Sequence, residues 1–325
     1  MLAQRNTALA APGTVVMIRP AAFGFNEETA DSNAFQHRPG SGGEDGGSAA
    51  IRASALVDFD DLVRVLDGAG VEAVVFEDTA EPAKPDAVFP NNWITFHPDG
   101  TVVLYPMQAR VRRLERRPDV IFELETRHGF RVRRVIDLSA HEAENRFLEG
   151  SGSLVFDDDA RCVYAGLSPR TDPDLARNLA ELLSYDLELF QPIDDDGRPV
   201  YHTNVVLTIG ARICVVADGT IRDPARRGRV LDRLGATGRD IVCISTAQME
   251  RFAGNLIALT GANRQSRMLM SATARDALGA GALERIGRHS EPLVASVPTI
   301  ERVGGGSVRC MVADVRLPRA ARSDD

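Results

Sequence analysis

The stretch Phe147-Leu148-Glu149-Gly150-Ser151-Gly152-Ser153-Leu154-Val155-Phe156 runs from a glycine-rich loop into a strand, and the turn Asp157-Asp158-Asp159 follows it. Arg161-Cys162-Val163-Tyr164-Ala165 then forms the expected hairpin partner of that strand. Asp172-Pro173 next opens a helix, expected over residues 172–184, in the manner of an N-cap followed by an N1 proline. A loop, a hairpin and a helix therefore make up one unit of the fold.

The same unit recurs about five times, every 50 to 70 residues, without an obvious repeat in the sequence itself. Further strands are expected at residues 14–19, 71–76, 101–105, 131–136, 200–209, 213–216, 241–244, 256–260, 267–271 and 293–297, and further helices at about 51–69, 111–128, 224–235 and 273–280. Such repetition favours a closed, propeller-like α/β ring. A doubly wound sheet is the alternative, but the frequent hairpins favour antiparallel pairing, and no G-x-G-x-x-G follows the first strand.

The amino-acid composition indicates a globular protein and argues against a nucleic-acid-binding or membrane protein. The chain has 325 residues, of which 44% are hydrophobic and 26% charged, as in soluble globular proteins. Its net charge of −8, without a basic domain, argues against a nucleic-acid partner. The densest basic run, residues 110–117, is interpreted as a solvated surface. No run of about 18 apolar residues occurs, so no membrane association is expected.

The four cysteines are far apart, which indicates neither a disulfide framework nor a zinc site and favours a cytoplasmic location. Cys162, Cys214 and Cys243 lie in apolar strand-like runs and are expected in the core. The expected organisation is a disordered tail, a single domain with one flexible loop rich in glycine, and a short C-terminal tail. These segments cover residues 1–13, 14–318 (with the loop at 37–50) and 319–325, respectively.

Cys310 is the cysteine in an unusual setting. It follows Val303-Gly304-Gly305-Gly306-Ser307-Val308-Arg309 and precedes a strand-like alternation, residues 311–318, that ends at a proline. Three consecutive glycines free the backbone for positive φ and for close approach to a ligand. The alternative is a small buried cysteine after a turn, since free cysteine is among the most buried residue types.

Polar clusters stand at the same place in several units, where a loop enters a hairpin strand. They are Phe89-Pro90-Asn91-Asn92, Glu149 to Ser153, His202-Thr203-Asn204 and Gly306 to Cys310. In a ring of repeats these loops converge on one axis, which would bring a thiol, an imidazole, a carboxylate and two amides together. That set suits thiol nucleophilic catalysis with a histidine that moves protons. Taken singly, each cluster is better explained as a simple turn, and only the coincidence of all four favours the functional interpretation.

These stretches resemble the guanidine-modifying, or pentein, superfamily of arginine deiminase, dimethylargininase, succinylarginine dihydrolase and the amidinotransferases. Met17-Ile18-Arg19-Pro20, Phe23-Gly24-Phe25-Asn26 and Leu167-Ser168-Pro169-Arg170-Thr171 share in the resemblance, which spans nearly the whole chain. The chain is most similar to the amidinotransferase-like branch called citrulline utilization hydrolase.

The resemblance implies a five-bladed pseudosymmetric α/β-propeller of one domain, without a metal or an organic cofactor. It implies that Cys310 is the nucleophile, that His202 is the general acid and base, and that Glu149 holds the nitrogen groups of the substrate. Phe89 would pack on the planar head group, and Arg170 would lie near the substrate carboxylate.

Two departures from the deiminase pattern bear on the substrate. Asn92 and Asn204 stand where deiminases have aspartates, which grip a guanidinium through charge-assisted hydrogen bonds. An amide is neutral and can also donate to a carbonyl oxygen. The hypothesis is therefore a ureide substrate, with citrulline converted to ornithine, CO2 and NH3, and with Arg309 and loop N–H groups stabilising the thiolate or the oxyanion.

Other functions remain open from the sequence. An arginine or acylarginine dihydrolase, or a deiminase, would use the same residues, and amidino transfer would add an acceptor amine. A pentein that binds a ligand without catalysis is the alternative of another class. The expected partner is a small molecule like citrulline or arginine, and the sequence leaves a homo-oligomer open.

Overall fold

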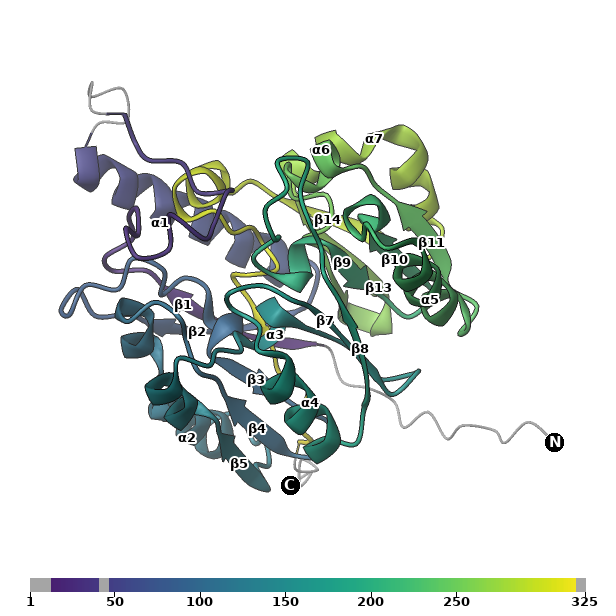
Figure 1. The fold of residues 1–325 in the computed structure, drawn as a ribbon. Coiled ribbons are helices and arrows are strands. Elements are labelled where there is room, and N and C mark those ends of the chain that lie inside the picture. Colours follow the sequence, from purple (N-terminus) through teal and green to yellow (C-terminus); the bar gives the residue numbers. More distant parts are fainter. Residues whose placement is uncertain (1–12, 41–46, 320–325) are drawn as a thin grey trace.

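The computed structural model describes residues 13–40 and 47–319 (Figure 1). Its strands form five three-stranded sheets. In chain order of their inner strands these are β3–β4–β5 (Ile94–Phe96, Thr101–Leu104, Arg134–Asp137), β6–β7–β8 (Leu154–Asp157, Cys162–Gly166, Asp186–Phe190), β9–β10–β11 (Leu207–Ile209, Ile213–Val216, Asp240–Cys243), β12–β13–β14 (Ile257–Thr260, Ser266–Ser271, Glu291–Ala295) and β15–β1–β2 (Ala313–Asp314, Thr14–Arg19, Glu72–Glu77).

All five sheets share one pairing pattern. The inner strand is antiparallel to the middle strand, and the middle strand is parallel to the outer one. A parallel pair needs a long crossover, and in each sheet that crossover contains a helix. These helices are α1 (Gly47–Gly68), α2 (Pro118–Thr126), α4 (Pro173–Leu182), α5 (Pro224–Gly235) and α7 (Ala272–Gly287). The short helices α3 (Gly150–Ser153) and α6 (Thr246–Met249) lie in connections between sheets.

The five sheets close into a ring, with helices on its outer side (Figure 1). Neighbouring inner strands pack side by side, β15 against β3, β6 against β9 and β9 against β12. The ring closes where the Gly13 N–H, just before β1, donates to the Thr260 carbonyl at the end of β12, at 2.7 Å. The last strand, β15, completes the sheet that the first strand began. The predicted five-bladed α/β-propeller is confirmed.

Several local predictions were wrong. The helix expected at 111–128 is a 3-10 turn (η2, Val111–Glu115) followed by α2, since Pro118 starts a new helix at its N1 position. The loop expected at 37–50 already turns helical at Gly47, where α1 begins, while residues 41–46 lie outside the described residues. The strand expected at 311–318 is only β15, and β8 was not predicted.

The predicted burial of the cysteines holds for two of the three that were expected in the core. Cys162 and Cys214 are buried, as predicted, but Cys243 is exposed because β11 is the outer strand of its sheet.

The tails expected at residues 1–13 and 319–325 lie almost entirely outside the described residues, which leaves them untested. None of the helices in the described part of the chain is long and apolar enough to cross a membrane.

One buried ion pair links two neighbouring blades. Arg239, just before β11, donates to both carboxylate oxygens of Asp157, at the end of β6, at 2.6 and 2.8 Å. The two side chains are 2% and 0% exposed. Removing one partner of such a pair leaves an uncompensated buried charge, which costs far more than the loss of a solvated pair.

We therefore expect Asp157→Asn to lower the free energy of unfolding by about 3 kcal/mol, because the buried Arg239 charge then keeps only the half-exposed Asp159 carboxylate, 3.4 Å from its Nη2, as an ionic partner. The midpoint and slope of urea unfolding measure the effect. Glu284→Gln is the matched control, since the Glu284–Arg288 pair has side chains 68% and 61% exposed and contributes little. An Asp157→Asn protein as stable as this control would contradict the role given to the ion pair.

Candidate active site

The loops that precede the inner strands all lie at the same end of the ring. The 3-10 turn η1 (Pro90–Asn92) leads towards β3, α3 leads into β6, and η4 (Thr203–Val205) leads towards β9. The turn that ends at Cys310 precedes β15, and Asn255 stands just before β12. Because the five inner strands surround one axis, their preceding loops converge there. The expected convergence of four loops is therefore observed, with a fifth member that the sequence analysis missed.

A cavity of about 10 Å³ lies where these loops meet, which is room for about one water molecule. It brings together the predicted residues Cys310, His202, Asn92, Phe89 and Arg170. The remaining lining residues are Asn33, Asp86, Arg112, Tyr201, Gly304, Gly305 and Gly306. Five of the eight predicted site residues thus share one small enclosed space.

Glu149 lies behind this cavity and orients His202. Its Oε2 lies 2.8 Å from His202 Nε2, and its Oε1 accepts from the Gln108 N–H at 3.0 Å. The carboxylate is fully buried. Burial by itself would raise the pKa of Glu149, but Arg170, His202 and Arg112 together bring that pKa well below its usual range. Glu149 is therefore a permanent anion, and its position follows from the glycine-rich turn α3 that it precedes.

His202 is neutral at physiological pH. Burial lowers the pKa of its imidazole to about 4, although the hydrogen bond with Glu149 opposes this shift. A neutral imidazole can accept a proton, and its carboxylate partner can stabilise the imidazolium that results. Gly152 makes room for this ring, since a Cβ atom there would lie 2.8 Å from His202 Nδ1 and 2.6 Å from Asn92 Nδ2.

Two amides surround the thiol of Cys310, which is 3% exposed. The Nδ2 groups of Asn204 and Asn255 lie 3.6 and 3.4 Å from Cys310 Sγ. Asn255 Nδ2 also donates to the Asn204 carbonyl at 3.1 Å, which ties the two amides together. Both are donors directed at sulfur, an arrangement that suits a thiolate. Asn255 was detectable from the sequence, because it precedes its strand as Asn204 precedes the neighbouring one.

Arg112 corrects the interpretation of the basic run as solvated surface, because its side chain is 2% exposed. Its guanidinium donates to both oxygens of Glu115 at 2.9 Å. Its Nη1 donates to Asn92 Oδ1 at 2.8 Å. Arg112 therefore sets which way the Asn92 amide faces, since the oxygen has to point at the guanidinium. In sequence it cannot be told from the arginines beside it, which are exposed or half-buried, and this explains why it was missed.

The glycine loop accommodates Phe89. Cβ atoms at Gly304 and Gly306 would lie 2.9 and 2.8 Å from the Phe89 ring, and Gly305 has a φ of +63° that favours glycine. The loop is held by Glu301, which accepts from the Ser307 hydroxyl at 2.6 Å. The glycines were expected to let Cys310 reach the axis. In the structure they also let an aromatic ring lie against the loop beside the thiol.

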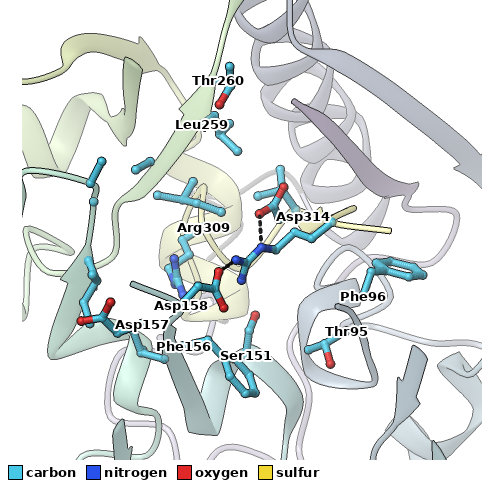
Figure 2. Close-up of a pocket in the computed structure, with 18 of the residues that line it drawn as sticks. Thr95, Phe96, Ser151, Phe156, Asp157, Asp158, Leu259, Thr260, Arg309 and Asp314 are labelled. Atoms are coloured by element: carbon cyan, nitrogen blue, oxygen red, sulfur yellow. Dashed lines mark ion pairs between the residues drawn. The ribbon is translucent and has the colours of Figure 1, made fainter. Parts of the chain in front are cut away.

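Arg309, expected to stabilise the thiolate or the oxyanion, does not line the Cys310 cavity. Its side chain instead lines a second, larger cavity (Figure 2). Its charge still acts on the thiol position. Burial lowers the pKa of Arg309, and the nearby Cys310 and Asp314 oppose that shift.

Arg170 is buried beside Glu149, with 3.5 Å between its Nη1 and Glu149 Oε2. Its Nη2 donates to the Ser32 hydroxyl at 2.8 Å, and its guanidinium lies 5.1 Å from the centre of the Tyr201 ring. Apart from Ser32 its contacts are long. Residues 13–40 and 47–319 contain no cluster of three or more side chains suited to hold a metal ion.

The family model described as "N,N dimethylarginine dimethylhydrolase, eukaryotic" matches residues 19–317. A search of curated proteins finds no significant match. Among solved structures, ArgZ, an arginine dihydrolase from the ornithine-ammonia cycle in cyanobacteria, aligns with a TM-score of 0.70 at 16% identity, over 95% of this chain and 41% of ArgZ. Unliganded AgrE aligns with a TM-score of 0.70 at 18% identity, over 95% of this chain and 40% of AgrE.

A dimethylarginine dimethylaminohydrolase bound to S-methyl-L-thiocitrulline has a TM-score of 0.64 at 17% identity, with 94% of this chain and all of that chain covered. This chain therefore spans about two fifths of ArgZ and AgrE but the whole of the dimethylaminohydrolase. At these identities the solved structures establish a shared fold, and the family model establishes the family.

We expect His202→Gln to flatten the pH dependence of stability. The imidazole has a pKa of about 4 in the folded state and about 6.5 when unfolded, so its contribution is complete above pH 6.5 and is lost as the pH falls. The loss of unfolding free energy between pH 7 and pH 5 should shrink by about 1–2 kcal/mol in the variant. Urea unfolding at both pH values measures it.

His141→Gln is the control, since that ring is 32% exposed and not packed in the site. It should leave the difference between pH 7 and pH 5 as it is in the parent protein. An equal slope in all three proteins would mean that His202 is not held as a buried neutral base.

Proposed function

The chain belongs to the N,N-dimethylarginine dimethylhydrolase family of the pentein superfamily, cysteine-dependent hydrolases of amidino C–N bonds, and we propose that its substrate is the ureide citrulline. The products would be ornithine, CO2 and NH3. The observation that carries this proposal is the direction of the Asn92 amide in the cavity beside Cys310. A cytoplasmic location suits a thiol enzyme of this kind.

Asn92 offers a donor to the cavity. Because its Oδ1 accepts from Arg112, its Nδ2 points elsewhere, and no described residue pairs with it. A buried donor without a partner costs free energy that a ligand can recover by supplying an acceptor. The ureido group has a carbonyl oxygen for this donor, whereas a guanidinium has only N–H donors. The amide orientation therefore favours a ureide.

The cavity also offers acceptors for the ureido N–H groups. Asn204 directs its Nδ2 at Cys310, and its Oδ1 finds no partner in the described structure. One oxygen of Asp86, a lining residue, is likewise unpaired there. Burial raises the pKa of Asp86, although Arg112 and Asn26 oppose the shift. The ureido group is neutral and carries one carbonyl acceptor and several N–H donors, which match the Asn92 donor and the Asn204 and Asp86 acceptors.

In the first step His202 takes the proton of the Cys310 thiol, and the thiolate that results attacks the ureido carbon. The tetrahedral adduct collapses as its terminal C–N bond breaks, and His202 returns the proton to the departing ammonia. The Asn92 Nδ2 group donates to the oxygen on which negative charge develops. A thiocarbamate that joins Cys310 to the ornithine nitrogen remains.

In the second step a water molecule gives a proton to His202 and attacks the thiocarbamate carbon. The C–S bond breaks, the Cys310 thiolate leaves and the proton returns to the medium or to the thiolate. The carbamate that forms loses CO2 and takes up a proton to leave ornithine. Glu149 stabilises the imidazolium in both steps, because its carboxylate is 2.8 Å from His202 Nε2.

Arg170 is assigned to the substrate carboxylate, as the family resemblance implies. The present cavity, about 10 Å³, has no room for a whole amino acid. Arg170 donates to the Ser32 hydroxyl at 2.8 Å, but its contact with the Thr29 carbonyl is long, at 3.5 Å. The side of the cavity that Arg170 forms is therefore held by few short contacts. We infer that the substrate displaces this wall and that its carboxylate replaces the Ser32 contact with a bidentate pair.

Arginine hydrolysis through a citrulline stage is the second candidate. The unpaired oxygen of Asp86 would accept from a guanidinium, and ArgZ, which has the same fold, is described as an arginine dihydrolase. On this reading the charge of the bound guanidinium favours the ionised form of Asp86, and the Asn92 donor has no ligand acceptor until the ureide is formed. Ammonia yield separates the two reactions.

Product analysis with citrulline and arginine side by side tests the proposal. We expect one ammonia and one ornithine per citrulline, with a higher kcat/KM for citrulline than for arginine, and no turnover above background in Cys310→Ala. Cys214→Ala, which removes a buried thiol distant from the cavity, is the matched control and should remain active. Full ureide hydrolysis by Cys310→Ala would refute the nucleophile. Two ammonia per arginine at a higher kcat/KM would establish the second candidate instead.

Asn92→Asp combined with Asn204→Asp tests the amide argument. The change replaces the donor to the ureido oxygen by a carboxylate, so the citrulline-to-arginine ratio of kcat/KM should fall by about tenfold or more, the equivalent of one buried hydrogen bond. Asn178→Asp, an exposed substitution on α4, adds a charge away from the site and should leave the ratio unaltered. An unchanged ratio in the double variant would show that these amides do not select the head group.

A further inference from the structure

The second cavity lies on the axis of the ring, on the other side of the turn that carries Cys310. It has a volume of about 480 Å³, within the usual range of small-molecule sites. Every inner strand contributes lining residues, so the cavity is built by all five blades. Figure 2 shows acidic and basic side chains directed into it. The catalytic scheme uses none of its volume.

Most of the acidic groups in this cavity are already paired. Asp157 accepts two hydrogen bonds from Arg239, and Asp158 forms an ion pair with Arg316 and accepts from the Tyr185 hydroxyl. Asp159 lies 3.4 Å from Arg239 Nη2. These charges are neutralised within the protein and hold the walls together.

Arg309 and Asp314 are different. The Arg309 guanidinium makes one hydrogen bond, from Nη1 to the Leu256 carbonyl at 3.2 Å, and its buried Nε has no partner among the described residues. Asp314 is half-buried, with 34% of its side chain exposed, and it is only weakly paired, since Arg316 Nε lies 3.9 Å from its Oδ2 (Figure 2). Arg309 and Asp314 both line the cavity but form no ion pair with each other in the described structure.

A cation and an anion on one cavity wall, apart from each other, match a ligand that carries both charges. A carboxylate suits the guanidinium fork of Arg309, and an ammonium group suits Asp314. An ammonium would also relieve the carboxyl group of Asp314, because burial raises its pKa to about 7 despite the charge of Arg309. A simple anion would satisfy Arg309 and leave Asp314 as it is.

We propose that the second cavity binds a small zwitterion of the α-amino acid class, with its carboxylate at Arg309 and its ammonium group at Asp314. This site is separate from the Cys310 cavity and lies directly behind it. It does not depend on the proposed function, because binding there requires no turnover.

Isothermal titration of the full chain with L-alanine tests the proposal. Alanine carries both charges but neither a ureido nor a guanidino group, so it is not a substrate for the Cys310 site. We expect saturable binding at one site, weakened about tenfold or more in Arg309→Gln and in Asp314→Asn, which corresponds to about 1.4 kcal/mol. Acetate and methylammonium, which carry one charge each, should bind more weakly than alanine.

Arg264→Gln is the matched control. Arg264 lines the same cavity and forms no ion pair with a described residue, so its loss should leave alanine binding unchanged. Arg309→Lys keeps the charge and should retain part of the affinity, which guards against a folding defect in Arg309→Gln. The urea midpoint of each variant confirms that it is folded.

Three results would overturn the proposal. They are no saturable binding of alanine to the parent protein, equal affinity in Asp314→Asn and the parent, and acetate binding as tight as that of alanine. The last would identify a site for simple anions. A protein that binds alanine as expected but does not hydrolyse citrulline would leave this site standing and refute only the proposed substrate.

Discussion

The Glu149 carboxylate, which has no contact with solvent, is the constraint on which the catalytic end of the molecule depends. An isolated ion in the protein interior is too costly to exist without compensation. Here Arg170, Arg112 and His202 surround it, and the Gln108 N–H completes its hydrogen bonds. The compensating groups come from segments far apart in the sequence, so a folded ring is needed to assemble them. In return the carboxylate holds His202 in place as a neutral base.

Arg112 extends this constraint to Asn92. Its guanidinium is shared between Glu115 and Asn92, so the Asn92 Nδ2 group points away from it and has no partner among the described residues. On the proposed function, hydrogen-bond direction selects the substrate as well as charge. A rotated Asn92 amide would present its oxygen and suit a guanidinium better. The buried ion pairs that appear structural thus set the chemistry of the cavity.

The ring gives the protein two unlike cavities on one axis. Cys310 and Arg309 are adjacent in the chain, yet one lines a tight cavity of about 10 Å³ and the other an open one of about 480 Å³. The glycine loop and Phe89 fill the first cavity, whereas ion pairs between blades form the walls of the second. A single turn, which carries both Arg309 and Cys310, contributes to the walls of both.

The sequence by itself determined the repeated unit, the five-bladed ring and the convergence of loops that carry Cys310, His202, Asn92 and Glu149. Those features follow from local signals, namely strand alternation, turn residues and N-caps, and from the position of each loop in its unit. Only the tertiary structure decided that Arg112 is buried, that Arg309 faces a second cavity and that Asn255 lies beside the thiol. Burial and side-chain direction depend on which distant segments pack together. From the sequence alone, an arginine in a basic run is interpreted as solvated. Only the folded chain brings Arg112 to the carboxylates that compensate its buried charge.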